Sequence, residues 1–136
     1  VKEARDLLGE KMIIGGTANT IEEALKHCDE GADYIGIGPY RYTQTKKVLS
    51  PVLGMQGVRL VVDGIRDHGV KIPIIAVGGI LPSDLHNLCK VGVSGVAVSG
   101  CLTDAIVNNN APAIFLNMKK YWRTSDKNEY DKIDEL

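Results

Sequence analysis

The chain has 136 residues, of which 44% are hydrophobic and only 5% aromatic, and it contains 15 glycines. Its 16 basic and 17 acidic residues nearly cancel, which argues against a nucleic-acid or membrane-surface binder, because such proteins normally carry a basic excess. No apolar run approaches the ~18 residues that a membrane span needs. Three cysteines (Cys28, Cys89 and Cys101) lie far apart, which argues against a disulfide framework or a zinc site and predicts a cytoplasmic protein.

Short apolar runs predict four strands, at residues 12–15, 34–37, 74–77 and 95–98. None of these runs alternates with polar residues, so we expect both faces of the strands to be covered, as in a parallel sheet. Helical signals separate the runs. Thr20 and Glu23 form a capping-box pattern that opens a helix through Glu30, and Pro82 suits the first turn of a helix over residues 84–90.

Glycines are placed to end helices and lead into the next strand, at Gly9, Gly31, Gly69 and Gly92. A further helix is predicted over residues 112–122, and the charged segment 123–136 is interpreted as a polar tail. Repeated βα units with parallel strands fit an open sheet or part of a closed barrel. A complete (β/α)8 barrel takes roughly 200 to 250 residues. We therefore expect an α/β domain over residues 1–122, equivalent to the C-terminal half of a (β/α)8 TIM barrel, about four βα units.

The distinctive residues all follow predicted strands, which favours the barrel, because barrel enzymes place their chemistry on the loops after the strands. Gly78-Gly79 follows the third strand and Ser99-Gly100 follows the fourth. Glycines at strand ends let backbone N–H groups approach an anion, and a following helix N-terminus favours negative charge. Two such turns side by side predict a phosphate-binding cup.

The loop over residues 39–54 is long for a βα connection, where roughly 2 to 6 residues are typical, and such loops are usually functional. Thr43 and Thr45 provide hydroxyl donors for phosphate oxygens, and Lys46 provides a point cation that can neutralise phosphate charge. This loop is the sharpest functional signal in the sequence.

The string G-A-D-Y-I-G-I-G-P at residues 31–39, followed by T-Q-T-K-K at residues 43–47, resembles the G-A-D-Y-x-G-x-G-P…T-x-T-K signature of thiamine phosphate synthases. Residues 75–80 and 92–98 resemble the last two strands of that family, so that the resemblance runs from about residue 1 to residue 101. It implies a transferase of thiamine biosynthesis that couples hydroxymethylpyrimidine diphosphate with thiazole phosphate and releases pyrophosphate.

The resemblance also implies roles for particular residues. Lys46 would hold the diphosphate as the catalytic residue, and Thr17 would replace a family serine that contacts the pyrimidine diphosphate. The remaining substrate-binding residues would surround the thiazole phosphate: Thr43, Gln44, Thr45, Gly79, Ser99 and Gly100. The family usually has its last serine where Gly100 stands. Here Ser99 comes one position earlier, so a backbone donor would replace that side chain.

The family's cofactor is Mg²⁺, whose aspartate ligands the resemblance places in the N-terminal half of the barrel. Asp33, Asp63 and Asp104 fall at strand or helix positions, so we expect no metal ligand in this chain. The chain alone would then be inactive and would need the other half of the barrel, from a preceding segment or a second copy. Nucleic acids and membranes are not expected as partners.

Two alternatives remain. The related thiazole tautomerases lack T-x-T-K and have a histidine where this chain has Asn19, so both differences favour the synthase. The other alternative is a non-catalytic phosphate-binding half-barrel that serves as an assembly module. Such a module would share the glycine turns without needing Thr43, Thr45 and Lys46 together.

Overall fold

The structure, a computed structural model, describes residues 1–42 and 51–130, with side chains as far as residue 122. A four-stranded sheet in the order β1-β2-β3-β4 is parallel throughout. The strands are β1 (Gly15–Ala18), β2 (Tyr34–Ile37), β3 (Ile74–Val77) and β4 (Gly95–Ala97). The helices are α1 (Lys2–Leu8), α2 (Ile21–Asp29), α3 (Gly54–Asp67), the 3-10 helix η1 (Pro82–Asp84), α4 (Leu85–Val91), α5 (Gly100–Val107) and α6 (Ala111–Tyr130). The expected succession of parallel βα units is confirmed.

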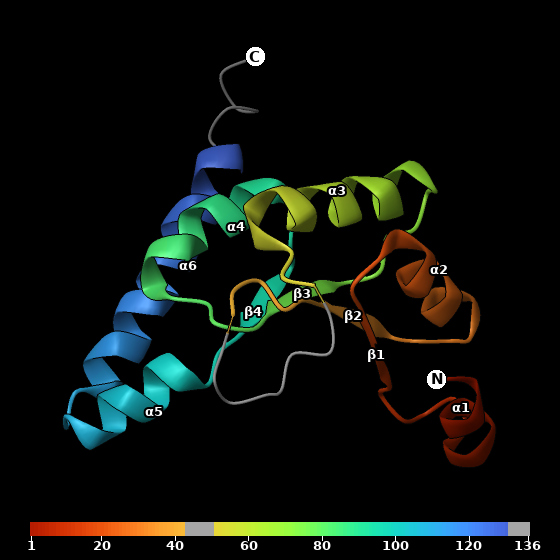
Figure 1. Cartoon of the computed structure of the whole chain (residues 1–136), viewed down its shortest axis with the longest axis horizontal. Coiled ribbons are helices and arrows are strands. Elements are labelled where there is room, and N and C mark those ends of the chain that lie inside the picture. The colour runs from red at the N-terminus through yellow and green to blue at the C-terminus, as the bar shows by residue number, and fades with distance from the viewer. Residues whose placement is uncertain (43–50, 131–136) are drawn as a thin grey trace.

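Helices cover one face of this sheet (Figure 1). Alternate strand residues such as Ile35 and Ile74 are fully buried on that face. The opposite face leaves Thr17 exposed, Tyr34 39% exposed and Val77 half-buried. The expectation that both faces are covered is therefore wrong for the part of the chain that the structure describes, where only one face is covered.

The first strand does not lie where the apolar run predicts it. That run covers residues 12–15, whereas β1 is Gly15–Ala18. Met12 and Ile13 are instead 52% and 80% exposed. Gly16 packs so closely on α2 that a Cβ atom there would lie 2.7 Å from the Cβ of His27. Small residues allow this contact, so the strand consists of glycine, threonine and alanine instead of the apolar run before it.

The starts of α2 and of the η1–α4 segment follow the predicted signals. Thr20 Oγ1 accepts a hydrogen bond from the Glu23 N–H at 3.2 Å, and the Glu23 carboxylate accepts one from the Thr20 N–H at 3.2 Å, which confirms the capping box. Pro82 opens η1, which leads directly into α4. The last helix, predicted over residues 112–122, is longer and continues to Tyr130.

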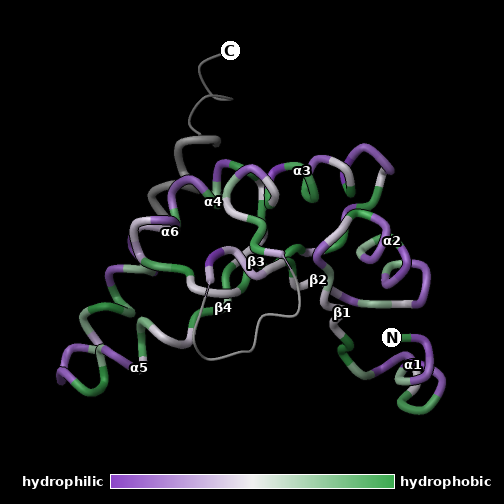
Figure 2. The backbone as a smooth tube through the Cα atoms, viewed as in Figure 1, coloured by the Kyte–Doolittle hydropathy of each residue, from purple (hydrophilic) through white to green (hydrophobic). Residues whose placement is uncertain are grey.

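The core lies between the helix-covered face of the sheet and the helices outside it. Helix α3 contributes Val58, Val61, Val62 and Ile65, and α4 contributes Leu85 and Leu88, all buried. Figure 2 shows hydrophobic residues along β3 and alternating hydrophobic and hydrophilic stretches along α3. Among the described residues, no helix has the length and apolar character to cross a membrane.

Candidate functional site at the carboxyl edge of the sheet

The carboxyl ends of the strands meet at one edge of the parallel sheet, as the register requires. Ala18 pairs with Ile37, and Val77 pairs with Ala97. The turns that follow these strands therefore start side by side along this edge. They begin at Asn19, Gly38, Gly78 and Val98.

The ends of β2 and β3 approach each other closely. A Cβ atom on Gly38 would collide with the Val77 carbonyl oxygen, and one on Gly78 would lie 2.8 Å from the Pro39 Cα. Gly78 also has a φ of 94°, a conformation that L side chains rarely adopt. Beyond the strands, the Tyr40 N–H donates to the Val77 carbonyl at 2.8 Å, so the main chain of the second loop continues beside the glycine turn.

The described ends of the loop between β2 and α3 are joined at its base. The Leu53 N–H donates to the Pro39 carbonyl at 2.8 Å, and the Gly54 N–H donates to the Tyr40 carbonyl at 3.0 Å. The Asn19 side-chain amide donates to the carbonyls of Gly38 and Pro51 at 3.0 and 2.9 Å. The loop is thus held both by its own backbone and by the turn after β1.

An arginine–aspartate pair connects this loop to the turn after β3. Arg41 Nη1 lies 2.9 Å from Asp84 Oδ2, and Arg41 Nη2 lies 3.0 Å from Asp84 Oδ1. Arg41 Nη1 also donates to the Gly79 carbonyl. The Leu81 N–H donates to Asp84 Oδ2 at 2.8 Å, and the Tyr40 hydroxyl lies 3.4 Å from Asp84 Oδ1. Asp84 is buried, so protein donors replace water around its carboxylate.

These contacts keep the pair ionised. Burial raises the pKa of the Asp84 carboxyl, but the hydrogen bonds from Arg41 and from the Leu81 N–H outweigh burial, and the pKa lies below its usual range. The hydrogen bonds to Asp84 raise the pKa of Arg41 above its ordinary value. Burial, and then the Asp84 charge, raise the pKa of the Tyr40 hydroxyl. The Arg41 guanidinium also lies 5.1 Å from the centre of the Tyr40 ring, within range of a cation–π interaction.

The predicted phosphate cup falls on the ends of adjacent strands. Gly79 is two residues past Val77, and Ser99 is two residues past its partner Ala97. The Ser99 carbonyl accepts hydrogen bonds from the N–H groups of Leu102 and Thr103, both at 3.0 Å, and Gly100 begins α5. The Ser99 side chain is exposed and makes no capping hydrogen bond. This geometry leaves its hydroxyl at the start of the helix.

The structure places Thr17 within β1, where it pairs with Gly36, and not in the turn that follows the strand. Its exposed side chain lies on the uncovered face, two strands away from the glycine turn of β3. The other predicted residues of the second loop lie outside the described residues: Thr43, Gln44, Thr45 and Lys46. Their roles stay predictions.

Sequence reasoning missed the pairing of Arg41 with Asp84 and the role of Asn19 at the loop base. The two partners lie 43 residues apart in the sequence. An acidic residue just before α4 gives a helix-start signal, which indicates the local structure of Asp84 and not its distant partner.

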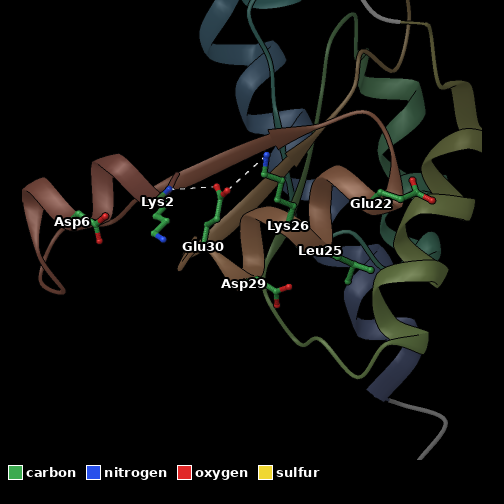
Figure 3. A pocket seen from close by; sticks show the side chains of 7 residues that line it. All are labelled: Lys2, Asp6, Glu22, Leu25, Lys26, Asp29 and Glu30. Carbon is green, nitrogen blue, oxygen red and sulfur yellow. Dashed lines mark hydrogen bonds and ion pairs between the residues drawn. The ribbon is translucent and has the colours of Figure 1, made fainter.

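A metal site and a surface groove were also considered as functional sites. Within the described ranges 1–42 and 51–130, no three His, Cys, Asp or Glu side chains are grouped so that they could hold a metal ion. An open groove of about 640 Å³ lies between α1 and α2 (Figure 3). Mostly charged residues line it: Lys2, Asp6, Glu22, Leu25, Lys26, Asp29 and Glu30.

Comparison with known proteins decides the family. A family model described as thiamine monophosphate synthase matches residues 1–102. The chain belongs to the thiamine monophosphate synthase family. The thiamine-phosphate synthase of Bacteroides thetaiotaomicron is 44% identical over 120 residues, which are 88% of this chain and 57% of the relative. That of Bacteroides fragilis is 49% identical over 105 residues, which are 77% of this chain and 52% of the relative.

A solved family structure shares the fold. Thiamine phosphate pyrophosphorylase from Pyrococcus furiosus aligns with a TM-score of 0.75 and 29% sequence identity over 91% of this chain and 55% of that one. The chain spans about half the length of the curated relatives that it matches. The family match ends at residue 102, so most of α5 and all of α6 lie beyond it.

Proposed function

We propose that the protein carrying this chain is a thiamine phosphate synthase, a transferase that joins hydroxymethylpyrimidine diphosphate to thiazole phosphate and releases pyrophosphate. The observation that carries the proposal is the 44% and 49% identity to proteins named thiamine-phosphate synthase. Glycine-containing turns at the adjacent ends of β3 and β4 support its phosphate-binding part.

The reaction requires little covalent chemistry from the protein. The carbon–oxygen bond between the pyrimidine methylene and the diphosphate breaks, and its electron pair leaves with the diphosphate. The thiazole nitrogen then donates its lone pair to the resulting cation and forms the new carbon–nitrogen bond. The protein contributes by orienting the nucleophile and by stabilising the charge that develops on the leaving group.

We assign the residues as their resemblance to the family implies. Lys46 holds the departing diphosphate, and Thr17 contacts the pyrimidine diphosphate. The thiazole phosphate lies among Thr43, Gln44, Thr45, Gly79, Ser99 and Gly100. The position of Thr17 on the uncovered face of the sheet suits a residue that faces a substrate inside a closed barrel.

Mg²⁺ would supply positive charge to the diphosphate when bound. The described residues do not fit a metal site, since they contain no suitable group of ligands, and we derive no step through the ion. Its ligands, and the surface that covers the open face of the sheet, belong in this proposal to the N-terminal half of the barrel. The predicted cytoplasmic location is part of the same proposal and agrees with three cysteines that form no disulfide.

The thiazole tautomerase alternative is not favoured. The position where that family has a histidine is Asn19, whose amide donates to the carbonyls of Gly38 and Pro51. An amide in this arrangement supports the loop and has no proton-transfer chemistry near neutral pH. The non-catalytic module is not favoured either, because the curated relatives carry the name of an enzyme.

The test is an assay of thiamine phosphate formation by the full-length protein, with Lys46→Ala as the diagnostic variant. Loss of a charge-assisted contact to the leaving diphosphate should cost about 2 to 4 kcal/mol of barrier, which lowers turnover about 30- to 1000-fold. Lys90→Ala is the matched control, because Lys90 is an exposed lysine in the last turn of α4. A parent protein without activity would refute the function, and Lys46→Ala turnover within twofold of the parent would refute the assignment of Lys46.

A further inference from the structure

Arg41 sits where two segments of the proposed phosphate site meet. Its backbone N–H donates to the Gly78 carbonyl at 2.9 Å, and the backbone N–H of the preceding Tyr40 donates to the Val77 carbonyl at 2.8 Å. The segment that leads into the T-Q-T-K loop therefore runs directly beside the glycine turn after β3. A group at this junction can influence both segments.

The Arg41 side chain contacts that turn at two points. Its guanidinium forms a two-pronged pair with the Asp84 carboxylate, at 2.9 and 3.0 Å, and also donates to the Gly79 carbonyl. Asp84 in turn accepts a hydrogen bond from the Leu81 N–H at 2.8 Å. Arg41 and Asp84 thus bracket the turn, with Gly79 held at its start and Leu81 at its end.

The geometry favours a role for Arg41 on the backbone of the turn over a direct role as the cation that binds substrate. The charge of its guanidinium is already matched by a buried carboxylate at hydrogen-bonding distance. Its contact with Gly79 acts on the backbone instead. In a trans peptide the carbonyl and the next N–H point in opposite directions, so fixing the Gly79 carbonyl also fixes the direction of the Ile80 N–H. Backbone N–H groups of this turn are the phosphate donors in the proposed function.

We propose that Arg41 is a positioning residue that, through Asp84 and the Gly79 carbonyl, holds the turn after β3 in the conformation that receives the phosphate of the thiazole substrate. This inference rests on the proposed function for the identity of that substrate. It adds a residue pair to which the family resemblance assigns no role.

The chain contains a matched control at the other end of the sheet. Arg5 pairs with Asp33 at 2.6 Å and donates to the carbonyls of Gly31, Gly9 and Met12 at 2.7 to 3.1 Å. This second pair has the same chemistry, but its hydrogen bonds hold the backbone segments that precede β1 and β2, at the amino ends of these strands. Loss of Arg5 should therefore lower stability without disturbing the carboxyl edge.

The experiment measures the KM for each substrate, kcat and Tm for the full-length protein and its variants. Arg41→Ala should raise the KM for thiazole phosphate about tenfold or more and the KM for pyrimidine diphosphate less than about threefold. Arg5→Ala should lower Tm and leave both KM values within about twofold of the parent. The KM for thiazole phosphate of the Arg41→Ala/Asp84→Ala double variant should lie within about threefold of that of Arg41→Ala, because both changes remove the same interaction.

Arg41→Lys carries the test if Arg41→Ala does not fold. A lysine keeps the charge but cannot span both carboxylate oxygens and the Gly79 carbonyl, so the KM for thiazole phosphate should still rise, by at least about threefold. Unchanged KM values in a variant with lowered Tm would overturn the proposal and leave Arg41 a structural residue only. Equal increases in both KM values would also overturn it.

A parent protein that forms no thiamine phosphate would refute the proposed function. The inference about the turn would then be tested by phosphate binding instead of by kinetics. Calorimetric titration with inorganic phosphate then decides. Phosphate binding that weakens at least about fivefold in Arg41→Lys, and not in Arg5→Ala, supports the positioning role. Equal affinity of the parent and Arg41→Lys, or no binding by the parent, overturns it.

Discussion

The side-chain amide of Asn19 donates a hydrogen bond to the Gly38 carbonyl oxygen at 3.0 Å, which ties the turn after β1 to the end of β2. The same nitrogen lies 2.9 Å from the Pro51 carbonyl, on the far side of the loop. The Asn19 backbone N–H donates to the Glu23 carboxylate of the capping box at 2.7 Å. One residue thus connects the start of α2, the end of β2 and the base of the long loop.

Asn19→Asp should destabilise the full-length protein more than Asn19→Ala does. Aspartate keeps the shape of the side chain but replaces the donor by an acceptor that faces two carbonyl oxygens. We expect a loss of about 1 to 3 kcal/mol for the aspartate and about 0.5 to 1.5 kcal/mol for the alanine, measured by urea unfolding. Asn87→Asp, an exposed position on α4, is the control. Equal effects of the two changes at Asn19 would contradict the assigned hydrogen bonds.

Gly78→Ala should be more damaging than Gly69→Ala, although both glycines have positive φ values, 94° and 75°. A Cβ atom on Gly78 would lie 2.8 Å from the Pro39 Cα, whereas one on Gly69 would meet nothing within 4 Å. Gly69→Ala should cost about 1 to 2 kcal/mol from backbone conformation alone. Gly78→Ala adds a steric clash at the junction of β2 and β3, so its loss in free energy of unfolding should be larger. Urea unfolding of both variants makes the comparison, and equal losses would mean that the two strand ends are not in close contact.

The pair of Arg41 and Asp84 predicts a pH dependence of stability. The pKa of Asp84 is lower in the folded protein than its unfolded value of about 3.9, so protonation favours the unfolded chain. The contribution of the pair is therefore fully present above the unfolded pKa and is lost as the pH falls through the folded pKa.

The measurement for this pair is the free energy of unfolding between pH 7 and pH 3, for the parent and for Asp84→Asn. The parent should lose more stability than Asp84→Asn as the pH falls through the acidic end of this range. The remaining acid sensitivity of the variant reports the other carboxylates, Asp33 among them, whose pKa is also lowered by hydrogen bonds from Ile14 and Arg5. Parallel pH profiles of parent and variant would mean that the Arg41–Asp84 pair is not formed.

The parts of the fold that local patterns specify were predictable from the sequence. The apolar runs of β2 and β3 coincide with the strands, and the pattern of Thr20 and Glu23 places the start of α2. In these cases the determining interactions lie within a few residues. The first strand was misplaced because its position depends on long-range contacts, in which Gly16 packs on His27 and the Ile14 N–H donates to the Asp33 carboxylate at 2.7 Å.

The candidate site was predictable only in part, for the same physical reason. The glycine turns could be placed because each follows an apolar strand directly in the sequence. Arg41 and Asp84 could not be paired, since 43 residues separate them and no repeating pattern links the end of one strand to the helix after the next. Asn19 is short, uncharged and preceded by a small residue, so nothing in the sequence marks its two distant carbonyl partners.

Thr43→Val and Thr45→Val should raise the KM for thiazole phosphate more than the KM for the pyrimidine substrate. Each change removes a hydroxyl assigned to the thiazole phosphate and keeps the branched shape of the side chain. Loss of one such hydrogen bond to a charged group should cost about 1.5 to 3 kcal/mol, or about 10- to 150-fold in KM. Steady-state kinetics with each substrate varied in turn provides the check. Equal increases in both KM values would mean that the Thr43 and Thr45 hydroxyls are wrongly assigned to the thiazole phosphate.

The 136-residue chain, produced alone, should not behave as a well-packed monomer. Its sheet has β1 and β4 at the edges, with unpaired outer sides in the part of the chain that the structure describes. The face opposite the helices exposes part of Tyr34 and Val77. Exposed strand edges and an apolar face promote association.

Sedimentation of the isolated chain should therefore show concentration-dependent association, or its near-UV circular dichroism should be weak while it binds ANS. Tyr34→Lys should reduce the association, because it places a charge on the uncovered face of the sheet. Leu60→Lys is the control, since Leu60 is 67% exposed on α3, on the helix side of the sheet. If Tyr34→Lys and Leu60→Lys change the association equally, the surface through which the chains associate is not the uncovered face of the sheet. A monodisperse monomer with sharp near-UV signals would mean that four βα units form a self-sufficient open sheet, and that the uncovered face does not need the other half of a barrel.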